Sequence, residues 1–250
     1  MKSTAGRTAV RSGLVIAFVA LAFVGAGPAI AQIDSYVWLD ADGKPLPFQD
    51  FASIQEALRS ACVIEKQEIG RGVAGTLKLV LEYEGTRFHA AFRMVDIVKR
   101  EKTGSYRMNI KYRDAAIFEM AAYELSEMLG IHRVPPTVVR TIDGHNGTVQ
   151  AWLEKTDAED QLLEEGPINP PDPGYWWRQK AVMWVFDSLI ANVDRNQGNI
   201  HIDENWNLWF IDHTRAFRRI SVLLEADKIE ICDRRVWTEL QKLDEEKFRT

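Results

Sequence analysis

Three side chains in the C-terminal part of the sequence have the types and spacing needed to handle phosphate groups and metal ions. Asp194 and Asn199 lie five positions apart, and Asp212 follows eighteen positions after Asp194. In such a set, one carboxylate can orient an attacking hydroxyl, while an amide oxygen and a second carboxylate hold the metal ions that neutralise a triphosphate. The pattern is therefore suited to metal-assisted phosphoryl transfer.

The elements around these residues support a functional interpretation. The apolar pattern predicts a short hairpin formed by 200–202 and 208–211 and, before it, a helix over Tyr175–Asn192. The expected apolar side of this helix consists of Trp177, Ala181, Trp184, Val185, Ser188 and Leu189. Asp and Asn are also common turn and cap residues, which is the structural alternative. The Asp-x-x-x-x-Asn spacing between a helix and a hairpin, with an acidic residue after the hairpin, is the arrangement of protein-kinase catalytic loops.

The preceding part of the chain is predicted to hold strands and helices that could form one side of the site. Apolar spacing favours a short helix over Phe51–Cys62, opened by Asp50, and a longer one over Asp114–Leu129, ended by Gly130. Between them, 77–83 and 87–92 alternate as a hairpin, and a second hairpin follows Pro135-Pro136. The expected fold class is α+β.

The chain is expected to divide into four segments. Residues 1–31 have the layout of a cleavable signal peptide, because Arg7 and Arg11 precede an apolar run that ends in Ala29-Ile30-Ala31. We therefore expect an exported protein, periplasmic or secreted, with no stable membrane span after cleavage. An acidic, proline-rich stretch, 155–174, reads as a surface linker. The expected boundaries are residues 32–153, a linker over 154–174, and residues 175–250.

Composition and cysteine spacing argue against some classes of function. The 250 residues carry a net charge of −5 and no basic stripe with interleaved aromatic residues, so a nucleic-acid partner is not expected. Cys62 and Cys232 lack the spacing of a zinc or redox motif. Either one disulfide or two separate thiols fits the sequence. His201 and His213 lie beside the motif but lack a suitably spaced third zinc ligand.

The motifs resemble those of a family of atypical kinases. Asn192-Val193-Asp194-Arg195-Asn196-Gln197-Gly198-Asn199 and Phe210-Ile211-Asp212-His213 are similar to motifs of phosphoinositide 3/4-kinases, HipA-type kinases and the secretory-pathway Golgi casein kinases. The resemblance covers roughly residues 69–217, and it is weaker in the N-terminal part. It implies a bilobal protein-kinase-like fold: an N-lobe antiparallel sheet with one αC-like helix, and a reduced, mainly helical C-lobe with the catalytic hairpin.

The resemblance also implies roles for individual residues. Asp194 would be the catalytic carboxylate, and Asn199 and Asp212 the metal ligands for Mg²⁺ or Mn²⁺. Glu119 would pair with a strand cation that contacts the phosphates of ATP. Because this sequence has Ala90-Ala91-Phe92-Arg93 where the family usually places a lysine, Arg93 ranks first for that cation. The remaining nucleotide-binding candidates are the loop glycines Gly70, Gly72 and Gly75, the alternative cations Lys78 and Lys99, and the hinge residues Gln150 and Trp152.

The resulting hypothesis is an ATP- and metal-dependent phosphotransferase that acts on a hydroxyl of a protein or small molecule. Three alternatives remain. A pseudokinase would bind nucleotide or a partner protein without catalysis, and Arg93 together with the short segment after Phe217 favours it. Nucleotidyl transfer would use the same residues with ATP reversed. A structural domain without a ligand would require the whole motif set to be coincidental.

Overall fold

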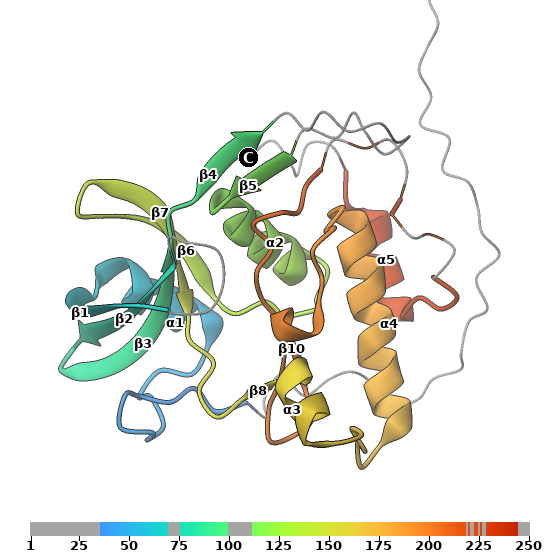
Figure 1. Ribbon diagram of the computed structural model, residues 1–250, viewed down its shortest axis with the longest axis horizontal. Helices are drawn as coiled ribbons and strands as arrows, with labels where there is room; N and C mark the ends of the chain where they lie inside the picture. The colour runs from blue at the N-terminus through green and yellow to red at the C-terminus, as the bar shows by residue number, and fades with distance from the viewer. Residues whose placement is uncertain are drawn as a thin grey trace, which may run out of the picture.

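The computed structural model describes residues 36–69, 76–99 and 112–218, and after these 220, 223, 224, 226 and 229–244. It confirms the predicted α+β class, since antiparallel sheets and helices are both present. Figure 1 shows β1, β2, β3 and α1 at one end of the molecule and α4 and α5 at the other, with α2 and β10 between them. The elements are β1 (Cys62–Glu68), β2 (Thr76–Tyr83), β3 (Thr86–Arg93), β4 (Asp96–Lys99), β5 (Tyr112–Ala115), β6 (Thr137–Ile142), β7 (His145–Ala151), β8 (Asp157–Ala158), β9 (Ile200–Ile202), β10 (Leu208–Phe210), α1 (Phe51–Ser60), α2 (Ile117–Met128), α3 (Glu159–Glu165), α4 (Pro173–Leu189), α5 (Arg234–Lys242) and the 3-10 helix η2 (Gln197–Asn199).

The largest sheet has the strand order β1-β2-β3-β7-β6, and each neighbouring pair is antiparallel. Both predicted hairpins are present. The β2–β3 turn uses Glu84 and Gly85 at φ values of 48° and 76°, the backbone that suits the twist of a two-residue hairpin. One face of the sheet is apolar because alternate residues point the same way; this face contributes Leu79, Leu81, Ala90, Phe92, Val149 and Ala151 to a buried cluster.

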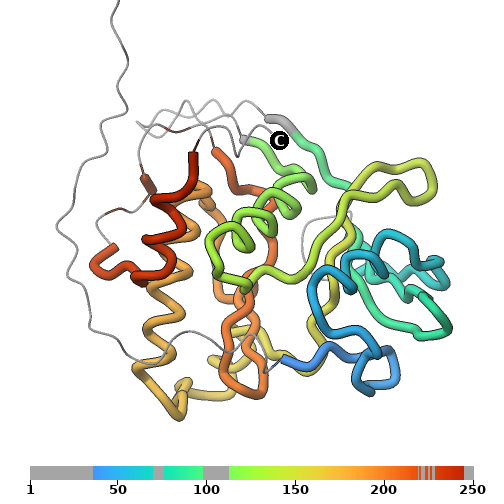
Figure 2. The backbone as a smooth tube through the Cα atoms, turned by 180° about the vertical axis from the view of Figure 1, so that it is seen from behind, coloured from blue at the N-terminus to red at the C-terminus, as the bar shows by residue number. Residues whose placement is uncertain are grey.

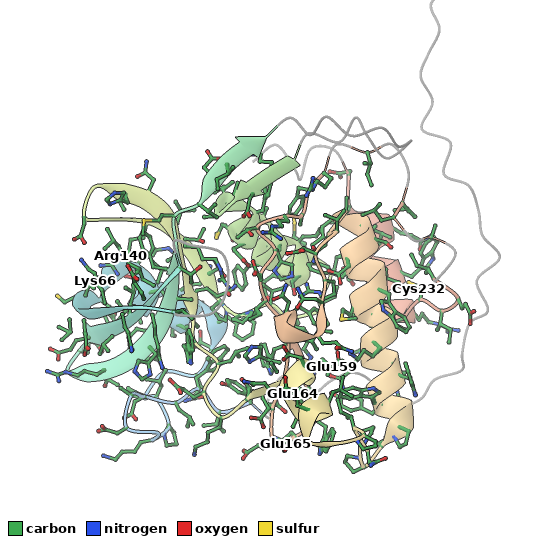
Figure 3. All side chains as sticks on the ribbon, viewed as in Figure 1. Lys66, Arg140, Glu159, Glu164, Glu165 and Cys232 are labelled. Carbon is green, nitrogen blue, oxygen red and sulfur yellow. The ribbon has the colours of Figure 1, made fainter. Side chains whose placement is uncertain are left out.

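Helix α1 covers this apolar face of the sheet. The Asp50 carboxylate accepts a hydrogen bond from the Ser53 backbone N–H at 2.9 Å, which caps the helix as the sequence predicted. Ile54 and Leu58 are buried in the same cluster as the sheet residues. At the other end of α1, Arg140 of β6 donates to the backbone carbonyls of Leu58 and Ala61, so strand and helix are also joined by polar contacts (Figure 3).

Helix α2 begins later than predicted. The helix was expected from Asp114, but Asp114 and Ala115 belong to β5, which pairs with β4, and α2 begins at Ile117. The Ala115 backbone N–H also donates to the carbonyl of Thr214 at 2.8 Å. These tertiary hydrogen bonds outweigh the local helical pattern. Figure 2 shows from behind that α2 lies between the large sheet and helices α4 and α5.

Helix α4 turns only part of its predicted apolar side toward the core: Val185 and Ser188 are buried, but the two tryptophans are not. Trp177 and Trp184, expected on its apolar side, are 59% and 38% exposed, whereas Met183 and Phe186 are buried. The helix is apolar over much of its circumference, so the sequence pattern does not distinguish the inward face. The position of the β9–β10 hairpin decides it, since Phe186 packs against Phe210 of β10 with ring centroids 6.4 Å apart.

The segment expected to be a surface linker contains regular structure. Strand β8 pairs with β9, and α3 follows directly. Glu159, at the start of α3, is buried and accepts a hydrogen bond from Lys180 of α4 at 2.5 Å, while Glu164 and Glu165 farther along α3 are exposed (Figure 3). Burial lowers the pKa of the Lys180 ammonium, although Glu159 opposes that shift. This segment therefore packs against α4 and β9, and the boundaries of the two lobes remain a prediction.

Two further sequence questions concern the cysteines and the membrane. Both cysteines are free thiols; Cys62 begins β1, and Cys232 lies at the opposite end of the molecule, just before α5 (Figure 3). Among the residues that the structure describes, no helix has the length and apolar character needed to cross a bilayer. The predicted signal peptide, 1–31, lies outside the described residues.

Candidate active site

Arg195 fixes the loop that carries Asp194 and Asn199. Its Nε and Nη2 atoms donate to the two carboxylate oxygens of Asp187 at 2.9 and 3.1 Å. Its Nη1 donates at 2.7 Å to the backbone carbonyls of both Asn199 and Ile211, and Nη2 also lies 2.9 Å from Nε2 of His213. A planar guanidinium with several donors suits such a cluster of acceptors. One side chain therefore joins α4, the Asp194 loop and the segment after β10.

This network brings Asn199 and Asp212 to neighbouring positions. The Ile211 backbone N–H donates to the Asn199 carbonyl at 3.2 Å, which places the residue before Asp212 directly against Asn199. Asp212 has a φ of 58°, a left-handed conformation that aspartate adopts more readily than most residues. Thr214 Oγ1 donates to Asp212 Oδ1 at 3.2 Å. The hairpin thus ends in a sharp change of chain direction at the predicted metal ligand.

The Asp194 carboxylate lies at the edge of the same loop and is 33% exposed. The loop is held by local bonds: the Asp194 backbone N–H donates to Asn192 Oδ1, and Asn199 Nδ2 donates to the Asp194 carbonyl at 3.2 Å. The side chain itself pairs with Arg215, whose Nη1 is 2.9 Å from Asp194 Oδ2. A partly exposed carboxylate on a fixed loop can reach an incoming hydroxyl group.

Glu119 of α2 connects the N-terminal half of the molecule to this loop. It is completely buried, and it accepts hydrogen bonds from the His213 backbone N–H at 2.8 Å and from His213 Nδ1 at 3.2 Å. Since Arg195 can only donate, Nε2 of His213 accepts its hydrogen bond, and the ring proton is assigned to Nδ1. Burial alone would raise the pKa of the Glu119 carboxyl, but Arg93 and the bonds from His213 outweigh it and lower the pKa to about 2.

Arg93 lies beside Glu119, at the end of β3. Its Nε is 3.6 Å from Glu119 Oε1, and its Nη1 donates to Gln150 Oε1 at 3.2 Å. Gln150 is itself buried and donates to Thr137 Oγ1. The predicted helix carboxylate and strand cation are therefore neighbours, whereas the Gln150 side chain is already occupied within the protein. Gln150 also lies in register with Ala91 of β3 and Thr137 of β6, inside the sheet, so a hinge contact from this residue remains a prediction.

Lys78 and Trp152 lie near each other rather than beside Glu119. In the sheet register, Lys78 pairs with Ala91, which pairs in turn with Gln150, so Lys78, Gln150 and Arg93 share one face of the sheet. The Lys78 ammonium lies 4.5 Å from the centroid of the Trp152 ring, within the range of a cation–π contact. Gly70, Gly72, Gly75 and the side chain of Lys99 lie outside the described residues.

Several residues of the site were not predicted from the sequence. Arg195 and His213 belong to the motifs, but the sequence does not show that they hold Glu119 and Asp187 in one network. Asp187 had one available signal, because it is a single carboxylate within an apolar helix, and a buried carboxylate requires a partner. Arg215 had none, since its partner Asp114 is 101 positions away.

The metal assignment is compatible with the chemistry of the donor atoms. Carboxylate and amide oxygens, as in Asp212 and Asn199, are the hard ligands that Mg²⁺ and Mn²⁺ accept. Among the described residues, no group of three or more His, Cys, Asp or Glu side chains could hold a metal ion. A metal at Asn199 and Asp212 would therefore need further oxygen ligands, which the phosphates of a bound nucleotide can supply.

Comparison with known proteins gives a partial match in sequence and a broader one in structure. No protein-family model matches the chain. A curated relative, Protein Rv2133c of Mycobacterium tuberculosis, is 30% identical over 122 residues, which cover 38% of this chain and 44% of the relative. The chain thus spans less than half the length of that relative, and its similarity does not establish a family.

Similar solved structures include two of a Golgi casein kinase and one of a hydra Fam20 protein. The Golgi casein kinase is 15% identical, with a TM-score of 0.48, and the match covers 78% of this chain and 65% of the kinase. A second structure of this kinase, with Mn/ADP bound, is 14% identical, with a TM-score of 0.47, and the match covers 77% of this chain and 65% of the kinase. The hydra Fam20 structure, with sugar, is 16% identical, with a TM-score of 0.47, and the match covers 67% of this chain and 66% of the hydra protein.

Proposed function

We propose that the protein is an ATP- and divalent-metal-dependent phosphotransferase with a protein-kinase-like fold, acting on a hydroxyl group of a protein or small molecule. The observation that carries the proposal is the Arg195 network. A single guanidinium holds the carbonyls of Asn199 and Ile211, so Asp194, Asn199 and Asp212 are brought together at one end of the β9–β10 hairpin. These are the carboxylate and amide groups that phosphoryl transfer requires.

Each side chain has a defined task in the proposed reaction. Asp194 accepts a hydrogen bond from the acceptor hydroxyl and orients its oxygen toward the γ-phosphorus. A bond forms between these two atoms as the bond from the γ-phosphorus to the bridging oxygen of ADP breaks, and the hydroxyl proton passes to Asp194. Asn199 and Asp212 would hold Mg²⁺ or Mn²⁺, which supplies positive charge against the phosphates when bound. The protein contributes mainly positioning.

The nucleotide would lie against the polar face of the large sheet. Arg93 is directed to this face together with Lys78, and both carry positive charge toward an anionic ligand. Arg93 keeps its orientation through Glu119. Trp152 would stack on the base at the hinge, and Gly70, Gly72 and Gly75 would cover the phosphates. The proposal includes export, which the arrangement of residues 1–31 supports.

The direct test is phosphoryl transfer from ATP in the presence of Mn²⁺, followed by mass spectrometry of the protein and of added hydroxyl acceptors. We expect Asp194→Asn to lower turnover at least 100-fold while nucleotide affinity changes little, because the amide retains the shape but cannot accept the proton. Asp42→Asn, at an exposed turn, is the matched control. Wild-type turnover in Asp194→Asn contradicts the proposal, and a nucleotidyl mass on the product identifies the alternative transfer.

A second candidate function is nucleotide binding without transfer. Arg93 favours it, because its planar guanidinium differs in reach from the lysine that similar kinases carry, and it already contacts Gln150 and Glu119. A nucleotide titration separates the two functions. Metal-dependent binding with no phosphorylated product under any acceptor condition would support a pseudokinase that acts through a partner protein.

A further inference from the structure

Arg215 forms an ion-pair bridge between the catalytic loop and strand β5. Its Nη1 lies 2.9 Å from Asp194 Oδ2, and its Nε lies 3.0 Å from Asp114 Oδ2. Asp114 is 1% exposed, so its carboxylate has been removed from water and needs a compensating charge. A guanidinium can serve both carboxylates at once because its donors point in fixed and different directions.

The backbone that carries Arg215 is tied down on both sides. Before it, the Thr214 carbonyl accepts from the Ala115 backbone N–H at 2.8 Å, which attaches the segment to β5. After it, the Phe217 backbone N–H donates to the carbonyl of Ile190 at the end of α4, and the Phe217 ring packs on Phe118 at 5.6 Å. The backbone position from which the Arg215 side chain extends is therefore fixed.

We infer that Arg215 is a positioning residue for the acceptor side of the site, which sets the orientation of the Asp194 carboxylate by holding Oδ2 and leaving Oδ1 toward the acceptor hydroxyl. This inference rests on the proposed function. A carboxylate that is held by one oxygen cannot rotate freely, so its second oxygen meets the hydroxyl in one direction. Arg215 is held in turn by Asp114, a buried residue of β5, so the orientation of the Asp194 carboxylate depends on β5.

Arg215 could also have the opposite effect and inhibit the reaction, and an experiment can distinguish the two roles. A cation paired with Asp194 could instead withdraw the carboxylate from the reaction and act as a brake. The double attachment to Asp114 favours positioning, since a brake must release Asp194, whereas this guanidinium is held by a buried partner and by a fixed backbone. Removing Arg215 lowers turnover in the first case and raises it in the second.

The experiment compares wild type, Arg215→Met, Arg215→Lys, Asp114→Asn and the double variant Arg215→Met/Asp114→Asn. Arg87→Met is the matched control, because Arg87 forms an exposed pair with Glu82 in the β2–β3 hairpin. For Arg215→Met we expect kcat to fall about 10- to 100-fold, an order typical of lost orientation of a catalytic group, with KM for ATP changed less than threefold. Arg215→Lys should recover part of kcat, and the double variant should lose no more than Arg215→Met alone.

A second measurement keeps the test independent of activity. Hydrogen exchange of the amides in 192–199 should accelerate in Arg215→Met and remain unchanged in Arg87→Met, because only the former removes one of the contacts that hold this loop. A wild-type protein that transfers no phosphate would refute the proposed function, and the exchange data would then decide the role of Arg215. Unchanged exchange, or a kcat that stays constant or rises in Arg215→Met, overturns the inference.

Discussion

Two arginines of the candidate site, Arg195 and Arg93, are held very differently. Arg195, in the C-terminal half, makes five contacts between 2.7 and 3.1 Å, to Asp187, His213 and two backbone carbonyls. Arg93, in the N-terminal half, makes longer contacts, 3.2 Å to Gln150 and 3.6 Å to Glu119. Contacts at such distances are weaker and easier to exchange for another acceptor. The comparison indicates that the fold fixes the Asp194 loop, whereas Arg93, the proposed phosphate-binding cation, can exchange its contacts for those of a ligand.

The largest expected effect is a loss of stability when the Arg195 network of the C-terminal half is broken. Arg195→Met would leave the Asp187 carboxylate buried without its guanidinium, and breaking a buried pair from one side costs about 3–5 kcal/mol. We expect the free energy of unfolding to fall by that amount in urea denaturation. Arg87→Met, which removes an exposed pair, should change it by less than about 1 kcal/mol. Equal losses in the two variants would show that the Arg195 network does not organise the loop.

A smaller effect is expected at the connection between the halves. The folded-state pKa of Glu119, about 2, is below its ordinary value of 4.5. Its contribution to stability is therefore fully present above pH 4.5 and is lost as the pH falls through about 2. We expect Glu119→Gln to remove on the order of 2 kcal/mol of acid-dependent stability, measured as a shallower fall of the unfolding free energy between pH 5 and 2 than in wild type. Parallel curves for the two proteins would contradict the pairing.

The smallest effect is expected at Arg93 itself. Arg93→Lys preserves the positive charge beside Glu119, so the free energy of unfolding should change by less than about 1 kcal/mol. Nucleotide affinity, measured by titration calorimetry, should stay within about tenfold of wild type, a difference of 1.4 kcal/mol. A greater loss of affinity would mean that the planar guanidinium is required, and that the N-terminal half is as specialised as the C-terminal half.

Features that depend on neighbouring residues could be predicted from the sequence, whereas features that depend on distant partners could not. The motif residues, the β9–β10 hairpin and helix α1 follow from local spacing and capping, because each depends on neighbours in the chain. The inward face of α4 and the late start of α2, after β5, depend on distant partners, Phe210 and Thr214. Neither helix periodicity nor cap residues contain that information.

The buried polar network shows the same limit. The expected proximity of Glu119 to a strand cation came from a resemblance, and the structure places Arg93 there. The bonds that fix Glu119 and the catalytic loop, through His213 and Asp187, join residues whose pairing has no periodic signal. The linker prediction for 155–174 was wrong about local structure for a related reason: α3 is stabilised by Glu159 contacting Lys180 of the next helix.

The most direct test of the central claim is the thermal midpoint of the purified protein with ATP, with Mn²⁺, and with both, for wild type and Asp212→Ala. If Asn199 and Asp212 hold a metal against a nucleotide, ATP and Mn²⁺ together at about 100 times their apparent dissociation constant should stabilise wild type by about 2.7 kcal/mol, a rise of roughly 5–10 °C. Asp212→Ala should lose most of that rise. No shift at millimolar ATP and Mn²⁺, or the same shift in both proteins, would contradict the proposed site.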